Sequence, residues 1–419
     1  MSENPVKAFE VEKKSNGLID VPGFEACGVA CDIRSKNNGQ LDLAIIFSAQ
    51  PCTAGGVFTR NAIKAAPVKL SQKLLQQQKH IHGIITNSGN ANACTGQKGY
   101  QNAISMQKLA ANAFRVPTDS FFVCSTGKIG ITLPITKIRK GVKGIRSLAN
   151  SSAIQGKKAA RAILTSDTHE KISTVKIPFG KKLITIAGMA KGAGMIEPQM
   201  ATMLAFIATD AAISKNLLQQ ILKTAVKDSF NAITVDGDMS TNDTVLALAN
   251  GNSKLRITPS STLYNRFTKA LCYLCNDLAY KIVSDGEKIT KIVEVIVKGA
   301  KSQNDAEKIA RSIGNSVLVK SSWYGNDPNW GRLLDAIGYA GASIIEEKIN
   351  LAYQHRHKKS GPISIFKKGV PSLRNKAKWK QIVGERQFSI LLDLNLGKGS
   401  YRLLSTDLTD KYVNFNKSE

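Results

Sequence analysis

An apolar stretch interrupted by glycine, residues 184–214, limits the folds open to this chain more than any other segment. Its interruptions are Gly188, Gly192, Gly194 and Pro198. The apolar segment that follows them, Ala201 to Ile213, contains Asp210 and is shorter than the roughly 18 apolar residues that a transmembrane helix needs. We therefore expect no membrane span. Because 42% of the 419 residues are hydrophobic, we expect a globular protein of roughly two or three domains with a large buried core.

Apolar runs that alternate with glycine-containing loops predict strands and helices in alternation along the chain. Alternating or uniformly apolar runs predict strands within residues 24–70, at 83–86, from 121 onward, at 292–299 and at 316–325. Apolar residues at helical spacing predict helices at about 100–114, 215–230, 263–283 and 302–313, and residues 233–251 are expected to form a strand, a loop and a helix. This alternation is typical of an α/β or α+β layered enzyme.

The net charge raises the question of a nucleic-acid partner. With 58 Lys and Arg against 31 Asp and Glu, the formal charge is +27, and basic surfaces that neutralise phosphates are typical of nucleic-acid-binding proteins. However, the lysines are spread along the whole chain, and aromatic residues that could stack on bases make up only 6%. The densest basic run, residues 355–386, is interpreted as a solvated surface. We therefore expect no nucleic-acid partner. The alternative hypothesis from a different functional class is a basic nucleic-acid-binding protein.

The amino terminus and the cysteines both point to the cytoplasm. Glu3, Glu10 and Glu12 stand where a secretory signal would need an apolar run. The seven cysteines are odd in number and scattered, which predicts reduced thiols. Cys272 and Cys275 form a CxxC without a second pair of ligands nearby, so we interpret them as packing residues and predict no metal site.

Several familiar site motifs fail on their spacing. The glycines at 188, 192 and 194 do not match a dinucleotide-binding loop, and no GxxxxGK[ST] occurs. Asp236 opens a segment like a calcium loop, but Thr241 and Ala247 stand where the loop requires glycine and glutamate. No GxSxG elbow is present, and the SxxK spacing at Ser125 and Lys128 has no KTG element after it.

An enzyme built from this sequence needs a nucleophile and a base without histidine or metal. An amino-terminal threonine is one solution, because its α-amine has a pKa of about 7.7–8.0 and can act as base toward its own hydroxyl. Such a threonine must be created by cleavage of the chain. A small residue before it and a glycine-rich approach would suit attack on the preceding carbonyl, and Ala201-Thr202 meets this description.

Ten segments in order, from about residue 23 to 416, carry a family resemblance. They are GFEACGVACDI, TAGGVFTRNAIKAAPV, NSGNANACTG, STGKIG, AILTSDT, GMAKGAGMIEPQMATML, ITVDGDMSTNDT, SDGE, GNDPNWGR and DLTDKYVNFN. The chain resembles the self-processing Thr-nucleophile acetyltransferases of arginine biosynthesis, the ornithine acetyltransferase / glutamate N-acetyltransferase family. The resemblance implies an α/β fold, an α+β layered sandwich of amino-terminal-nucleophile-like architecture with helices packed on mixed sheets.

The resemblance also implies a reaction and its catalytic residues. Acetyl would move from N-acetylornithine to glutamate through an acetyl-enzyme, without a cofactor, and some members also use acetyl-CoA as donor. Thr202 would be the nucleophile, freed by cleavage after Ala201. Thr126 and Gly127 would form the oxyanion hole, which needs fixed donors aimed at the developing oxyanion.

Four further residues would bind the substrate if the resemblance holds. Lys191 would bind the substrate carboxylate, and Glu287 would hold the ammonium side. Thr165 would complete the amino-acid pocket, with Thr168 as an alternative. Asn416 would close the site from the carboxyl end.

The implied products of cleavage are an α chain of residues 1–201 and a β chain of residues 202–419, held together because strands from both build the core. Two such pairs would form a heterotetramer. Departures from the family pattern are Gln199 in place of Asn, Lys288 where glycine is usual, and a carboxyl terminus shorter by about five residues. The alternative enzyme is a self-processing amidohydrolase or aminopeptidase of similar architecture, which would release its acyl group to water.

Overall fold

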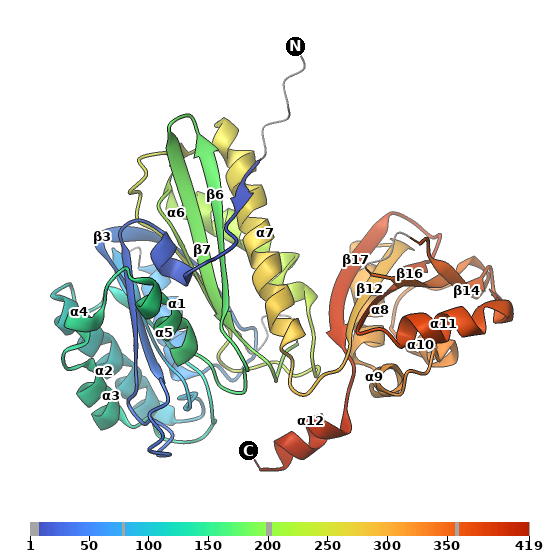
Figure 1. The fold of residues 1–419 in the computed structure, drawn as a ribbon, viewed down its shortest axis with the longest axis horizontal. Helices are drawn as coiled ribbons and strands as arrows, with labels where there is room; N and C mark the ends of the chain where they lie inside the picture. The colour runs from blue at the N-terminus through green and yellow to red at the C-terminus, as the bar shows by residue number, and fades with distance from the viewer. Residues whose placement is uncertain (1–7, 78–79, 198–202, 357–359, 419) are drawn as a thin grey trace. The chain divides into compact units, whose positions relative to one another are not determined.

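In the computed structural model, which describes residues 8–77, 80–197, 203–356 and 360–418, the chain divides into two units (Figure 1). The first unit comprises residues 1–192, 199–231 and 238–282, and the second unit comprises residues 193–198, 232–237 and 283–419. Each unit therefore contains residues from both sides of the predicted cleavage point. The two predicted cleavage chains divide the sequence differently, and that division remains a prediction.

The first unit is organised by a nine-stranded mixed sheet. Its main path is β1-β6-β7-β8-β10-β3-β4-β5, and β2 pairs with β3. The strands are β1 (Glu10–Val11), β2 (Phe24–Val29), β3 (Leu43–Phe58), β4 (Ile81–Asn87), β5 (Phe121–Ser125), β6 (Lys171–Phe179), β7 (Lys182–Lys191), β8 (Leu204–Thr209) and β10 (Thr244–Ala249). A separate pair joins β9 (Ala212–Ile213) to β11 (Arg256–Ile257) in parallel.

The long strand β3 belongs to both halves of this sheet. Its first half pairs with β2 and β4, its second half pairs with β10, and the register with β4 shifts between Phe47 and Cys52. Ile46 from the first half, Phe206 from β8 and Leu246 from β10 share one cluster of buried side chains. The two halves of the sheet thus pack on each other as layers with an apolar core between them.

Helices cover the outer faces of these layers (Figure 1). α6 (Lys215–Lys227) packs on β3, where Gly55 lies against Leu218 and Leu222. α7 (Thr262–Ser284) packs on β7, where a Cβ on Gly188 would come within 3 Å of two α7 leucines. On the other layer, side chains of α2 share a buried cluster with β3, β4 and β5. The remaining elements are α1 (Ala66–Gln76), α2 (Gly96–Phe114), α3 (Ile135–Val142), α4 (Ile145–Leu148), α5 (Ala153–Ala162), η1 (Gly17–Asp20) and η2 (Phe230–Ala232).

The second unit has a six-stranded sheet with helices packed against it. Its order is β15-β14-β13-β16-β12-β17. The strands are β12 (Ile292–Ala300), β13 (Asn350–His355), β14 (Ile363–Lys367), β15 (Val370–Pro371), β16 (Gln387–Asp393) and β17 (Gly399–Thr406). The helices are α8 (Gln303–Asn315), α9 (Val317–Tyr324), α10 (Trp330–Gly338), α11 (Lys376–Val383), α12 (Asp410–Phe415), η3 (Glu346–Lys348), η4 (Leu373–Asn375) and η5 (Asn416–Ser418). The sheet and helices α8 to α11 share one buried apolar cluster.

The predicted layered α+β fold with helices on mixed sheets is confirmed, and most predicted elements are present. The helices predicted at 100–114, 215–230, 263–283 and 302–313 correspond to α2, α6, α7 and α8. The strands predicted at 83–86 and 292–299 correspond to β4 and β12.

Three predicted elements are wrong. The start of 233–251 was expected to form a strand, but it contains only an isolated bridge between Ile233 and Leu404. Residues 316–325 were expected to form a strand but form helix α9, whose amino terminus is capped by the Ser316 hydroxyl accepting the Val319 N–H. The end of 233–251 was expected to be helical, but it is strand β10, which is buried on both faces between β8 and β3. The uniformly apolar run at 245–249 has no period that separates a buried strand from a buried helix, and the three apolar residues that begin 316–325 after Ser316 are too few to show one.

None of the helices in the described part of the chain is both long enough and apolar enough to cross a membrane.

Candidate functional site

Lys191 stands at the point where the predicted cleavage loop leaves the sheet. It is the last residue of β7 and pairs in register with Leu204, the first residue of β8. The connection between these two residues contains Ala201 and Thr202, both of which lie outside the described residues. Chain connectivity therefore returns the chain that follows the predicted nucleophile to the sheet at Leu204, beside the predicted carboxylate-binding lysine.

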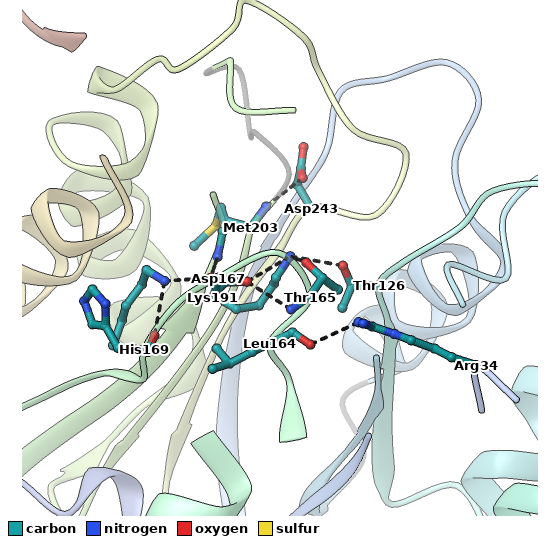
Figure 2. A network of polar contacts seen from close by, with 11 residues as sticks. Arg34, Thr126, Leu164, Thr165, Asp167, His169, Lys191, Met203 and Asp243 are labelled. Atoms are coloured by element: carbon teal, nitrogen blue, oxygen red, sulfur yellow. Dashed lines mark hydrogen bonds and ion pairs between the residues drawn. The ribbon is translucent and has the colours of Figure 1, made fainter. Parts of the chain in front are cut away.

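The ammonium of Lys191 contacts two other predicted site residues of the first unit (Figure 2). Its Nζ donates to Thr165 Oγ1 at 2.7 Å and to Thr126 Oγ1 at 3.4 Å. The Lys191 side chain is only 3% exposed. Thr126, which follows β5, and Thr165, which precedes β6, are 39 positions apart in the sequence but meet at one buried cation. Thr168, the alternative to Thr165, bonds instead to the neighbouring His169 ring.

Gly127 occupies a position that only glycine fits. Its φ is +131°, and a Cβ there would lie 2.3 Å from the carbonyl carbon of Gly89 and 2.4 Å from the Asn90 nitrogen. The backbone at 126–127 is therefore pressed against the preceding loop. A fixed backbone of this kind is what an oxyanion hole requires.

Buried asparagines, which the sequence reasoning did not identify, hold this loop in place. Asn242 Nδ2 donates to the carbonyls of Ala91 and Ser125 at 2.7 and 2.8 Å. Asn87 accepts from the Ser125 hydroxyl at 2.6 Å, and its carbonyl accepts the Thr126 N–H at 3.0 Å. The run of asparagines in NSGNANACTG was the available signal, because buried amides must find partners.

Asp167 is another residue that the prediction omitted. Its carboxylate bonds to Lys171 at 2.7 Å, accepts the Gly192 N–H at 2.6 Å and lies 3.7 Å from Lys191 Nζ. Burial raises its pKa, but the charges of Lys191 and Lys171 and these hydrogen bonds outweigh burial and hold the pKa well below its ordinary value. Asp167 is therefore an ionised buried acid.

Asp243, which precedes β10, contacts the first residue after the predicted nucleophile. It accepts the Met203 N–H at 3.0 Å and is fully buried (Figure 2). Burial raises the pKa of Asp243 well above its ordinary value, although Lys191 and nearby hydroxyls lower it in part. One hydrogen bond thus anchors the backbone directly after residue 202.

The remaining predicted residues, Glu287 and Asn416, meet in the second unit. Asn416 Nδ2 donates to Glu287 Oε2 at 3.3 Å. The Glu287 carboxylate lies against Gly194, where a Cβ would come within 2.4 Å of it, and the Glu287 N–H donates to the Ala193 carbonyl at 3.0 Å. The predicted site residues that the structure describes therefore form two groups, one in each unit.

The ArgJ family model matches residues 25–418, nearly the whole chain. The chain belongs to the ArgJ family. The family predicted from the sequence, that of the ornithine and glutamate acetyltransferases of arginine biosynthesis, is thereby confirmed.

Similar ArgJ proteins align over their whole length. The arginine biosynthesis bifunctional protein ArgJ of Oceanobacillus iheyensis is 41% identical over 420 residues, which cover 100% of this chain and 99% of that protein. ArgJ 1 of Clostridium acetobutylicum is 42% identical, covering 96% and 97%. The crystal structure of ornithine acetyltransferase from Mycobacterium tuberculosis in complex with ornithine is 35% identical, covers 45% of this chain and 98% of that one, and has a TM-score of 0.41.

Proposed function

We propose that this chain is a glutamate N-acetyltransferase of arginine biosynthesis that moves acetyl from N-acetylornithine to glutamate through an acetyl-Thr202 enzyme. The observation that carries the proposal is the meeting of Thr126, Thr165 and Lys191 at the sheet end where β7 and β8 are joined through Ala201 and Thr202. Membership of the ArgJ family supports the same reaction.

Self-cleavage between Ala201 and Thr202 comes first in this proposal. It yields residues 1–201 and 202–419, and the sheet explains how the two fragments stay together. β8 and β10 come from the second fragment and lie between β7 and β3 of the first, with all six residues of β8 paired to β7. Separation would break central backbone ladders and expose the core between the layers, so the cleaved protein remains one folded body.

Two half-reactions then follow on Thr202. Its Oγ forms an ester bond to the acetyl carbon of N-acetylornithine as the acetyl–nitrogen bond breaks, and the hydroxyl proton passes through the Thr202 α-amine to the departing ornithine amine. Glutamate then attacks through its neutral α-amine: a new amide bond forms, the ester bond breaks, and the proton released by that amine returns to Oγ. Thr126 and Gly127 stabilise the oxyanion in both steps.

The binding roles follow the chemistry of the side chains. Lys191 and Thr165 take the substrate carboxylate, Glu287 takes the ammonium, and Asn416, which already contacts Glu287, closes the site. The proposed mechanism needs no cofactor, and acetyl-CoA would enter only as an alternative acetyl donor. We further propose a cytoplasmic heterotetramer of two α and two β chains.

Intact-mass measurement combined with a transfer assay tests this proposal. Freshly purified protein is denatured and weighed, and a second sample receives N-acetylornithine with and without glutamate. We expect two fragments that join at Ala201–Thr202, and N-acetylglutamate formed in step with ornithine. Release of free acetate at the same rate without glutamate would instead identify a self-processing hydrolase. A parallel incubation of glutamate with acetyl-CoA decides whether acetyl-CoA is also a donor.

A further inference from the structure

The backbone at residues 195–196, on the approach to the predicted cleavage point, is held by a single carboxylate of the second unit. Asp236 Oδ2 accepts the Met195 N–H at 2.6 Å, and Asp236 Oδ1 accepts the Ile196 N–H at 2.8 Å. Met195 has a φ of +55°, a left-handed conformation that residues other than glycine rarely adopt. Such a conformation persists only where its surroundings impose it, and the two bonds to Asp236 do so here.

Further contacts within the second unit hold the next residues of the same segment. The Ile196 carbonyl accepts the Val235 N–H at 2.8 Å. Glu197 Oε1 accepts from the Arg311 guanidinium at 3.0 Å. The segment that ends at Glu197 is therefore fixed through both its backbone and its side chains.

Chain connectivity carries this constraint to the predicted cleavage point. In the cleavage step Thr202 Oγ bonds to the Ala201 carbonyl carbon, the peptide C–N bond breaks, the hydroxyl proton passes to the freed Thr202 nitrogen, and water hydrolyses the resulting ester. Residues 198–200 are all that separates Glu197 from Ala201. Because an extended chain spans at most roughly 3.6 Å per residue, the position of Glu197 limits where that carbonyl can lie. The rate of an intramolecular attack depends steeply on this placement.

The carboxylate that holds the turn is itself bonded to the last α-helix of the chain. Tyr412 on α12 donates its hydroxyl to Asp236 Oδ2 at 3.1 Å, and this is the oxygen that accepts the Met195 N–H. The buried ammonium of Lys320 also interacts with the charge of Asp236. Asp236 and Tyr412 come from ITVDGDMSTNDT and DLTDKYVNFN, two motifs to which the proposed mechanism assigns no role for either residue.

We propose that Asp236 and Tyr412 are positioning residues for self-cleavage. Asp236 holds the backbone turn at residues 195–196, from which the chain runs to the cleavage point, and Tyr412 aligns the Asp236 carboxylate through its hydroxyl. The last α-helix of the chain is thereby coupled to a reaction at residue 201. This inference rests on the proposed function in one respect, self-cleavage between Ala201 and Thr202.

The rate of self-cleavage in full-length variants tests the proposal. Each protein is made by cell-free synthesis, translation is stopped after a short pulse, and denaturing intact-mass measurement follows the decay of the uncut chain. Y412F removes the hydroxyl, D236N leaves one acceptor oxygen for two backbone N–H groups, and D236N/Y412F combines the two changes. Y324F is the matched control, because the Tyr324 hydroxyl donates to Asp410 on the same helix at 2.6 Å.

We expect the rate constant of cleavage to fall about threefold in Y412F, as for loss of one hydrogen bond, and about tenfold or more in D236N. Y324F should be cut at nearly the native rate. The double variant should be no slower than D236N, because Tyr412 acts through Asp236. Y412F is the decisive variant, since it leaves the charges of Asp236 and Lys320 unchanged.

Three results would each overturn the proposal: a native rate in Y412F, equal slowing in Y324F and Y412F, or effects that multiply in the double variant. Equal slowing would mean that any loosening of α12 matters, which is a purely structural role. Thermal unfolding of the cleaved products shows that each variant is folded. If D236N does not fold, the comparison of Y412F with Y324F decides alone.

Failure of the proposed function has a different signature. If the native chain is not cut between Ala201 and Thr202, self-cleavage fails as part of the proposed function, and this inference fails with it. If the native chain is cut and Y412F is cut equally fast, only this inference fails. If Y412F is slowed but the cleaved native protein moves no acetyl from N-acetylornithine to glutamate, the inference holds and the transferase proposal fails.

Discussion

The Nζ atom of Lys191 lies 2.7 Å from the hydroxyl oxygen of Thr165, and it is the buried hub at which Thr126 and Asp167 also meet. Lys191 closes β7, Thr126 follows β5 and Thr165 precedes β6, so three separate connections of the sheet deliver these side chains. Lys191 ends a packed strand and Thr126 directly follows one, while Thr165 is held by its hydrogen bond to Lys191. The group is therefore preorganised, which is what binding and catalysis both require.

Replacement of Thr202 by alanine is expected to abolish cleavage. T202A should remain one chain of 419 residues in a denaturing intact-mass measurement, because it lacks the hydroxyl that attacks the preceding carbonyl. The conservative variant T202S keeps a hydroxyl and should still give two fragments. Fragments of the same masses in T202A would contradict the nucleophile assignment.

Replacement of Gly127 by alanine should damage catalysis and stability together. A Cβ there meets backbone atoms at 2.3 and 2.4 Å at a φ of +131°, so the loop must move. We expect kcat to fall about 10²–10³-fold, as for loss of one oxyanion donor. Gly130 in the same loop is the matched control: its φ is also positive, but a Cβ there meets nothing within 4 Å. Equal kcat values for G127A and G130A would refute the assigned role.

Replacement of Asn242 by alanine should lower kcat, because Asn242 holds the loop that carries Thr126 and Gly127. N242A removes the two hydrogen bonds from Nδ2 to the carbonyls of Ala91 and Ser125 and the one that Oδ1 accepts from the Thr241 hydroxyl, which we expect to destabilise the fold by about 2–4 kcal/mol. Because the loop carries Thr126 and Gly127, kcat should fall while KM for N-acetylornithine changes less. Steady-state kinetics with urea unfolding measures both effects. N250A is the control, since Asn250 donates to the Pro22 carbonyl at another place.

The buried carboxyl group of Asp210 should make the free energy of unfolding depend on pH. Burial raises the pKa of Asp210 to about 6. The hydrogen bond that its carboxylate accepts from the Thr185 N–H favours the ionised form and offsets this rise only in part. The native state therefore holds this proton more tightly than the unfolded chain, and its contribution to stability is lost as pH rises from about 4 through 6. D210N cannot titrate, so its free energy of unfolding should vary less between pH 4 and 7. A pH dependence identical to that of the native protein would contradict this assignment.

Lys288 should show two opposing effects. Its φ of +55° costs roughly 1 kcal/mol relative to glycine, while its ammonium lies 4.8 Å from the centre of the Phe415 ring on α12. K288G relieves the strain and loses the ring contact, so its stability should be near that of the native protein. K288A loses the contact and keeps the strain, and should be less stable by about 1 kcal/mol. Hydrogen exchange in residues 410–418 should rise in both variants.

Much of the fold could be predicted because its signals are local. The apolar residues of α2 recur at helical spacing, and the polar loops that follow β4 and β5 stand out between apolar runs. The wrong predictions concern segments in which the local sequence pattern does not distinguish a strand from a helix. β10 is buried on both faces and shows no period, and the apolar, β-branched start of α9 favours a strand, although the Ser316 hydroxyl caps a helix there.

The sequence by itself determined the family, the layered α+β class and the residues Thr126, Gly127, Thr165, Lys191 and Glu287 as candidates, since each lies in a short motif of the chain. Only the tertiary structure revealed the supporting residues. Asn242 contacts Ser125 across 117 positions, and Asp167 contacts Lys191 across 24. Contacts between distant residues are set by how strands pair and layers pack, and they leave no periodic trace in the chain. The physical reason is burial, because charges and amides removed from water must find their partners wherever the fold brings them.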